Sequence, residues 1–158
     1  MASAQPVPVD DPAARELLAE YVAMRAESFP GQYTPAHPPR QMFEPPAGIF
    51  LVVRDDEGQS VGCGGIRRLP DGDAGVRYEV KHLYLRPSTR GRGWGRMLLD
   101  ELERHAREWG AAELVLDTHH TLTAAGGLYA SSGFVEIAPY NDNPNATRWY
   151  AKALSERG

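Results

Sequence analysis

The sequence predicts an α/β (α+β) fold with a mixed, mostly antiparallel central sheet and helices on both faces. Two observations carry this prediction. Residues 49–85 contain three strand-like segments separated by two turns, which is the pattern of an antiparallel meander. Residues 76–118 then follow the order strand, helix, strand, and such a unit forms a right-handed parallel crossover. A sheet that combines both units is covered by helices on its two faces.

Length and composition limit the class of protein. With 158 residues, 42% of them hydrophobic, the chain suits one domain over residues 1–158, of which residues 1–11 are expected to be loose. A net charge of -4 argues against general binding to nucleic acid or to anionic membranes. Cys63 is the single cysteine, and neither a signal peptide nor an apolar run of ~20 residues is present, so we expect a cytoplasmic protein.

The N-terminal part combines one helix with a proline-rich segment. Residues 7–9 can form at most a short strand, and Asp11 can cap a helix that has Pro12 at its first position. Six prolines within residues 29–48 exclude a continuous helix there and leave room for a helical turn at residues 40–43. This segment is either a loop on the substrate side or a covering loop, and both interpretations stay open.

The remaining elements follow from hydrophobic spacing and from turn residues. The meander strands are expected at residues 49–54, 60–69 and 76–85. They are followed by a helix at 94–109, a strand at 113–118, a helix at 123–132 and a hairpin of 134–138 with 147–154.

A glycine-rich loop connects the third meander strand to the next helix. It reads RGRGWGR over residues 90–96. Glycines let the backbone approach a ligand closely, and the helix that follows presents its first N–H groups in the same place. Three arginines add fixed positive charge. The loop therefore predicts a site for a pyrophosphate-bearing cofactor.

Two common phosphate loops fit this segment poorly. A P-loop requires Lys and Ser or Thr after its glycine, whereas Arg96 follows here. A dinucleotide fold is suggested by Asp117, which ends the next strand where a ribose-binding acid would lie. Against it, Arg96 stands at the third glycine position, Pro87 lengthens the link from strand to loop, and the meander does not suit a doubly wound sheet. A dinucleotide-dependent oxidoreductase is kept as a remote alternative.

The loop fits a third pattern, Arg/Gln-x-x-Gly-x-Gly/Ala, from Arg90 to Gly95. Together with the acidic strand at residues 79–85, the pair Leu128-Tyr129 and the pair Gly133-Phe134, it makes the chain resemble the GNAT superfamily of acyl-CoA-dependent N-acyltransferases over roughly residues 12–154. The tail at residues 139–144 is also similar to a branch of this family. The resemblance implies direct transfer of an acetyl group from acetyl-CoA, without a metal, to a primary amine of a small molecule or a peptide.

The resemblance also implies roles for individual residues. Glu79 matches a position that often supplies the general base, and Tyr129 would protonate the departing thiolate. Leu122 stands where the family frequently has Asn, seven residues before that tyrosine. The implied cofactor-binding residues, which would hold the pantetheine and the pyrophosphate of CoA, are Leu83, Tyr84, Leu85, Arg90, Gly91, Arg92, Gly93, Trp94, Gly95 and Arg96.

These roles compete with structural interpretations. On a regular strand, Glu79 shares a face with Lys81, Leu83 and Leu85, and it is either a base or the partner of Lys81 or Arg77 in an ion pair. Tyr129 is either an acid or a packed core residue.

Other reactive or aromatic side chains are weaker candidates. His119 and His120 are expected to point to opposite sides of a strand end, without metal-binding spacing, and one of them can reach the acceptor pocket. Cys63 has no neighbour that would make it a nucleophile. Four aromatic residues can either wall the acceptor site or pack in the core: Tyr33, Phe43, Tyr140 and Trp149.

The acceptor and the oligomeric state stay open. The acidic balance of the chain slightly favours a small cationic amine, while a peptide N-terminus or a lysine is not excluded. A homodimer is one option. The alternative function from another class is a CoA-binding regulatory module without turnover.

Overall fold

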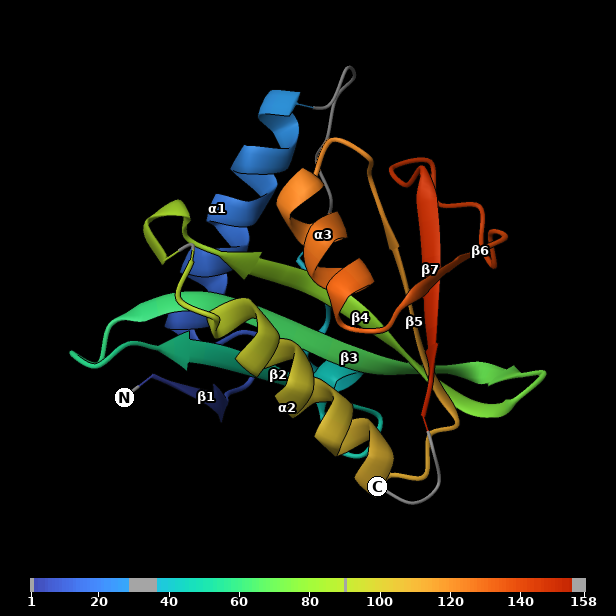
Figure 1. The fold of residues 1–158 in the computed structure, drawn as a ribbon. Helices are drawn as coiled ribbons and strands as arrows, with labels where there is room; N and C mark the ends of the chain where they lie inside the picture. Colours follow the sequence, from blue (N-terminus) through green and yellow to red (C-terminus); the bar gives the residue numbers. More distant parts are fainter. Residues whose placement is uncertain (1, 29–36, 90, 155–158) are drawn as a thin grey trace.

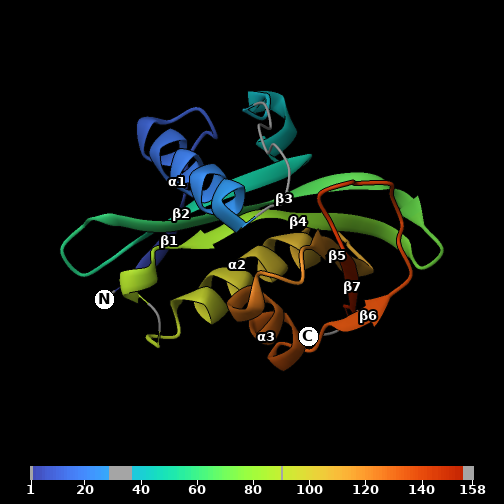
Figure 2. The same cartoon turned by 90° about the horizontal axis from the view of Figure 1, so that it is seen from above.

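The computed structural model describes residues 2–28, 37–89 and 91–154. A seven-stranded sheet in the order β1-β2-β3-β4-β5-β7-β6 forms its centre (Figure 1). The strands are β1 (Ser3–Pro6), β2 (Gly48–Arg54), β3 (Ser60–Gly72), β4 (Gly75–Leu85), β5 (Glu113–Thr118), β6 (Val135–Ile137) and β7 (Arg148–Ala153). Helix α1 (Pro12–Ser28) covers one face, and α2 (Trp94–Glu108) and α3 (Thr123–Ser131) cover the other (Figure 2).

The pairing of the strands confirms the predicted fold class. β2, β3 and β4 are antiparallel neighbours, and β4 pairs with β5 in parallel through the crossover that contains α2. β7 lies between β5 and β6 and is antiparallel to both. One parallel pair in an otherwise antiparallel sheet does not match a doubly wound dinucleotide-binding fold. Within the described ranges, no helix combines the length and apolar character that a bilayer crossing requires.

The N-terminal segment is more ordered than the sequence predicts. Ser3 to Pro6 add a strand to the edge of the sheet, with Ser3 opposite Arg54 and Pro6 opposite Leu51, so the expectation of a loose segment is wrong there. The side chain of Asp11 accepts a hydrogen bond from the backbone N–H of Ala13 at 3.0 Å, which confirms the predicted cap of α1.

The sheet separates two hydrophobic cores. Leu98, Leu99 and Leu102 of α2 are buried against one face. Leu17 and Leu18 of α1 are buried against the other face, together with Phe43 of the short 3-10 helix η1 (Arg40–Phe43). Because each face of β4 belongs to a different core, the direction in which a β4 side chain points determines which side of the sheet it lines.

Candidate active site

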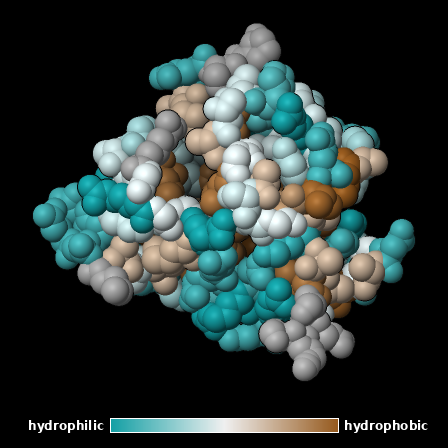
Figure 3. Space-filling model, in the orientation of Figure 1, coloured by the Kyte–Doolittle hydropathy of each residue, from teal (hydrophilic) through white to brown (hydrophobic). Residues whose placement is uncertain are grey.

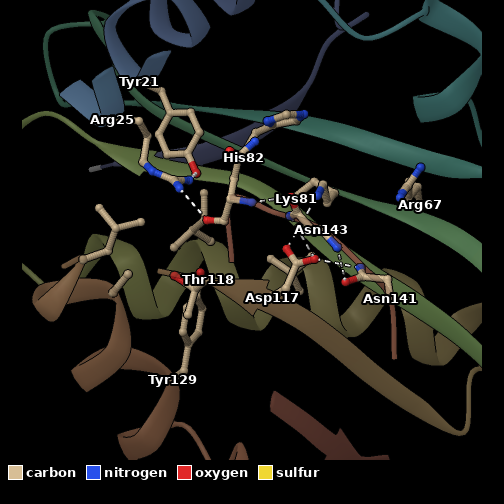
Figure 4. Close-up of a pocket in the computed structure, with 15 residues that line it drawn as sticks. Tyr21, Arg25, Arg67, Lys81, His82, Asp117, Thr118, Tyr129, Asn141 and Asn143 are labelled. Carbon is tan, nitrogen blue, oxygen red and sulfur yellow. Dashed lines mark hydrogen bonds and ion pairs between the residues drawn. The ribbon is translucent and has the colours of Figure 1, made fainter. Parts of the chain in front are cut away.

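A cavity opens where β4 and β5 separate. Their parallel pairing covers Arg77 to Glu79 opposite Glu113 to Val115 and extends no further. From Val80 onward, a cavity of about 280 Å³ lies between the two strands, α1 and α3. Figure 3 shows hydrophobic surface in the recesses at the middle of this side of the molecule, with hydrophilic side chains around it. The lining side chains come from α1, β3, β4, β5, α3 and the loop before β7 (Figure 4).

A bulge in β4 reverses the side-chain alternation beside this cavity. His82 has φ 60, and two residues of β4, His82 and Leu83, lie opposite Gly64 between two regular pairs. As a result, Leu83 and Leu85 pack with the core on the α2 face, while Tyr84 packs with the core under α1. The expectation that Glu79 shares a face with Leu83 and Leu85 is therefore wrong, because a regular alternation was assumed through residue 82.

The three implied β4 contacts to CoA thus differ in kind. Leu83 lines the cavity, and Leu85 packs close to the glycine loop, with its Cδ1 3.5 Å from where a Cβ at Gly95 would be. Tyr84 donates a hydrogen bond from its hydroxyl to Glu20 of α1 at 3.2 Å, so its ring faces away from this side. Only the backbone of Tyr84 is available to a ligand in the cleft between β4 and β5.

The glycine loop has the backbone geometry that a phosphate site requires. Gly91 and Gly93 have φ of +82 and +78, and a Cβ at either position would meet nothing within 4 Å. Gly93 is the N-cap of α2, and no described side chain caps that end of the helix, so the first N–H groups of α2 have no side-chain partner among the described residues. An open cradle of this kind fits the pyrophosphate of CoA. Arg90 lies outside the described residues.

The other loop residues have identified contacts. The guanidinium of Arg92 lies 5.2 Å from the centre of the Trp94 ring. Arg96 donates a hydrogen bond to the carbonyl of Ser131 at 2.9 Å and so connects α2 to the end of α3. A Cβ at Gly95 would lie 3.2 Å from Leu128, which indicates that this glycine lets α2 and α3 approach each other.

Tyr129 brings a phenol to the cavity from α3. The side chain is 5% exposed and points toward Thr118 (Figure 4). Burial raises the pKa of Tyr129 above its ordinary value, so the hydroxyl carries its proton at neutral pH. Among the described residues, none forms a hydrogen bond with this hydroxyl, although it borders the cavity. This hydroxyl is available to donate a proton to a reacting group.

Glu79 is completely buried beside the cavity and does not line it. Its Oε1 accepts a hydrogen bond from Arg67 at 2.8 Å, and its Oε2 accepts one from the hydroxyl of Tyr140 at 2.6 Å. The expected ion-pair partners were Lys81 and Arg77, but the structure pairs Glu79 with Arg67, which does line the cavity. Arg67 therefore stands between the carboxylate of Glu79 and the cavity.

Asp117 is a carboxylate that sequence reasoning considered only for a dinucleotide site. It lines the cavity at the end of β5, and its Oδ2 accepts hydrogen bonds from Asn141 at 2.8 Å and from Asn143 at 3.2 Å (Figure 4). Its Oδ1 lies 3.7 Å from the Nζ of Lys81. Trp149 donates to Asn141 at 2.9 Å and so helps to hold this loop over β5.

His82 is a second residue that the sequence did not single out for the site. His82 lines the cavity, and its ring makes edge contacts with Tyr21 and Phe43. Burial, helped by the charges of Lys81 and Arg67, lowers the pKa of His82 to about 3. His82 is therefore neutral at pH 7. Its positive φ, which non-glycine residues rarely adopt, could not be read from the sequence.

The histidine pair at the end of β5 lies differently from the prediction. The rings of His119 and His120 stack with their centres 4.5 Å apart, and neither lines the cavity. Both follow Thr118, the last residue of β5, so the strand alternation that would separate them no longer applies. Among the described residues, no group of three His, Cys, Asp or Glu side chains is arranged to hold a metal ion.

The remaining candidates have structural contacts. Phe43 packs in the core, Tyr140 binds Glu79 and Trp149 binds Asn141, and none of the three lines the cavity. Tyr33 lies outside the described residues. Burial raises the pKa of the Cys63 thiol, which agrees with the expectation that it is not a nucleophile.

The comparisons with known proteins identify similar sequences. The model of the Acetyltransferase (GNAT) family matches residues 18–134. An uncharacterised N-acetyltransferase of Schizosaccharomyces pombe is 41% identical over 106 residues, which are 67% of this chain and 63% of that protein. An IAA acetyltransferase of Azospirillum brasilense is 37% identical over 91 residues, which are 58% of this chain and 57% of that protein. The matched segment thus covers less than two thirds of the length of these curated relatives.

Solved structures share the fold over nearly the whole chain. A Klebsiella pneumoniae protein assigned to the acyl-CoA N-acyltransferases has a TM-score of 0.76 at 28% identity, over 98% of this chain and 99% of that one. A GNAT-family acetyltransferase of Staphylococcus aureus has a TM-score of 0.76 at 18% identity, over 98% of this chain and 100% of that one. The second likeness is one of fold alone.

Proposed function

Because the chain belongs to the GNAT family of acetyltransferases, we propose that it transfers an acetyl group from acetyl-CoA directly to a primary amine of a small molecule or a peptide. One observation carries the proposal. Strand β4 runs from the cavity that Tyr129 borders toward the glycine cradle, because Leu83 lines the cavity and Leu85 lies 3.5 Å from where a Cβ at Gly95 would be. A long phosphate-bearing thioester fits such a path, with its pyrophosphate on the cradle and its acyl end in the cavity.

The cofactor contacts in this proposal are mostly made by the backbone. The N–H groups that follow Gly91 and Gly93 would bind the pyrophosphate, and Arg92 would add a charge nearby. From Val80 onward, the edge of β4 that faces β5 has no paired strand among the described residues, whereas its other edge pairs with β3, so peptide groups on the β5 side are available to the amides of pantetheine. Leu83 would contribute apolar contact along the same path.

Transfer requires one proton to leave the amine and one to reach the sulfur. The nitrogen of the neutral amine forms a bond to the acetyl carbon as the bond from that carbon to sulfur breaks. Tyr129, whose hydroxyl borders the cavity and carries its proton at neutral pH, would then protonate the sulfur. Glu79 is our proposed acceptor of the amine proton through water, because its ion pair with Arg67 reaches the cavity wall. Asp117, which lines the cavity directly, is the second candidate.

The location and the alternative function are also proposals. We propose that the protein is located in the cytoplasm, because its single cysteine, Cys63, is a buried free thiol, as is typical of proteins in a reducing environment. A CoA-binding module without turnover would use the same cradle and would leave Tyr129 without a catalytic role.

The test is an acetyl-transfer assay that follows release of the CoA thiol with a panel of amines. We expect amine-dependent release by the wild-type protein and none by a folded variant that has lost the cradle, Gly93→Val. Calorimetric binding of acetyl-CoA without release in the presence of any amine would support the regulatory module instead.

A further inference from the structure

The part of the cavity on the α1 side combines side chains from four separate segments. Arg25 comes from α1, Arg67 from β3, Lys81 from β4 and Asn145 from the loop before β7 (Figure 4). This part lies across β4 from the core that contains Leu83 and α2, so it is where an acceptor would approach the thioester. The whole cavity measures about 280 Å³, which limits the acceptor group to a small one.

The charges that line this part of the cavity do not balance. Among the described residues, three cationic side chains line it, Arg25, Arg67 and Lys81, against the single carboxylate of Asp117. Counting the buried Glu79 behind Arg67 as a second negative charge still leaves an excess of positive charge. An excess charge in a partly enclosed site is unfavourable until a ligand of opposite sign binds there.

The carboxylate that lines the cavity is already engaged. One oxygen of Asp117 accepts from two asparagine amides, at 2.8 and 3.2 Å, and the other faces the ammonium of Lys81 at 3.7 Å. A second cation brought by the acceptor would have to displace these groups. The cavity is therefore poorly suited to polyamines and to other acceptors with several positive charges.

Arg25 is held in a fixed position. Its side chain is 5% exposed, one Nη donates to the hydroxyl of Tyr21 at 3.1 Å, and the other donates to the carbonyl of Asn145 at 3.0 Å. A guanidinium that is oriented in advance loses little entropy when it binds a ligand, and its planar geometry matches a carboxylate.

We propose that the acceptor is a small amine that also carries a carboxylate, of the size and kind of an amino acid, and that Arg25 and its cationic neighbours bind the carboxylate. This rests on the proposed acetyl transfer and specifies its substrate class. It also reverses the expectation of a cationic amine, because the net charge of -4 belongs to the whole chain and not to the cavity.

The first experiment compares alanine, methionine and phenylalanine, each with its own carboxamide, and adds spermidine and O-phosphoethanolamine. The carboxamides keep the side chain and the amine, and their amine is more often neutral, so a preference for the acids cannot come from amine reactivity. We expect kcat/KM to be at least tenfold higher for the acids than for their amides.

The outcomes separate the two proposals. Equal or faster transfer to the amides, to spermidine or to O-phosphoethanolamine would overturn the carboxylate-bearing acceptor and leave acetyl transfer intact. No transfer to any amine, with acetyl-CoA still bound, would contradict both.

The second experiment tests Arg25 through the acid-to-amide ratio, which a merely structural defect would not change. In Arg25→Gln we expect this ratio to fall about tenfold or more, and in Arg25→Lys, which keeps the charge, we expect much of it to remain. Arg104→Gln is the matched control, because Arg104 is an exposed residue of α2 that pairs with Glu101 and Glu108. A ratio that stays unchanged in both Arg25 variants would overturn the assignment of Arg25.

Discussion

The loop that begins α2 and the cavity beneath α1, which we propose as the cofactor site and the acceptor site, are built from different parts of the chain. At the loop, Gly91 and Gly93 have positive φ and expose backbone N–H groups, and seven consecutive residues contain the whole device. In the cavity, the groups available to a ligand are side chains such as Arg25 and Asp117, which are 92 positions apart in the sequence. The first site depends on local conformation, and the second depends on the entire fold.

This difference predicts how each site fails. A backbone cradle is sensitive to any side chain that alters φ or occupies its space, whatever the charge of that side chain. A cavity built from side chains is sensitive to the loss of single polar groups, and its neighbours can partly compensate. Substitutions at the loop should therefore act on CoA affinity, and substitutions in the cavity should act on turnover and on acceptor choice.

The largest effect is expected from Gly93→Val. A β-branched side chain is strained at φ +78 and would stand where the pyrophosphate approaches, so CoA affinity should fall by more than a hundredfold in calorimetry. Gly110→Val is the matched control, because Gly110 has φ +82 and equally open space at the far end of α2. Both variants should lose similar stability, and a Gly93→Val protein that is folded and binds CoA normally would refute the cradle.

The next effect concerns the base. Glu79→Gln keeps the shape of the side chain and removes the charge, so kcat should fall by about 10²–10³ and the acidic limb of the pH–rate profile should flatten. Tyr140→Phe is the control, because it removes a hydrogen bond to Glu79 and leaves the carboxylate in place. If Glu79→Gln lowers only the melting temperature, Glu79 is a structural partner of Arg67, and Asp117→Asn becomes the decisive variant.

A smaller effect is expected at the acid. Tyr129→Phe should lower kcat by about 10–10² with little change in the KM for acetyl-CoA, because the hydroxyl acts mainly in the transition state. Tyr150→Phe is a suitable control, since its ring packs 6.0 Å from that of Tyr129 in the same core. Normal turnover with a stability loss of ~1 kcal/mol would make Tyr129 a packing residue.

The last prediction concerns stability at acidic pH rather than activity. The pKa of His82 is lowered from its ordinary value of 6.5 to about 3 in the folded protein. Below pH 6.5, the unfolded chain therefore binds a proton at His82 more readily than the folded protein does. His82 therefore leaves stability unchanged above pH 6.5 and reduces it as the pH falls from 6.5 toward 3, by about 1 kcal/mol per pH unit.

His82→Asn removes this titration and suits the left-handed backbone, since Asn tolerates a positive φ. Urea unfolding at several pH values should show a flatter dependence for the variant than for the wild type. Equal slopes for the two proteins between pH 6.5 and 4 would contradict the buried, neutral His82.

Local patterns in the sequence were sufficient for most of the elements and for the position of the glycine loop that we propose to bind the cofactor. Three features depend on residues that are close together in the chain: the helix cap at Asp11, the parallel crossover and the glycine cradle. They can therefore be predicted from the sequence without knowledge of the fold. The strand limits differ from the prediction by only a few residues where turns are flexible, as at β3, which continues to Gly72. Among the described strands, β1 was missed, because its pairing with β2 depends on a partner more than 40 residues away.

Only the tertiary structure determined which side chains line the cavity that we propose as the acceptor site. A bulge with positive φ at His82 reverses the alternation of β4, so that Leu83 and Leu85 face the opposite side of the sheet from Glu79, and the sequence pattern carries no sign of such a bulge. The hydrogen-bond partners of Glu79 come from β3 and from the loop before β7. The asparagines that donate to Asp117 lie in the same loop, so these contacts form only when the loop packs against the end of β5. The net charge of the cavity is the sum of the charges of side chains that come from separate segments, and only the fold brings these segments together. The net charge of the whole chain therefore did not predict the sign of the charge in the cavity.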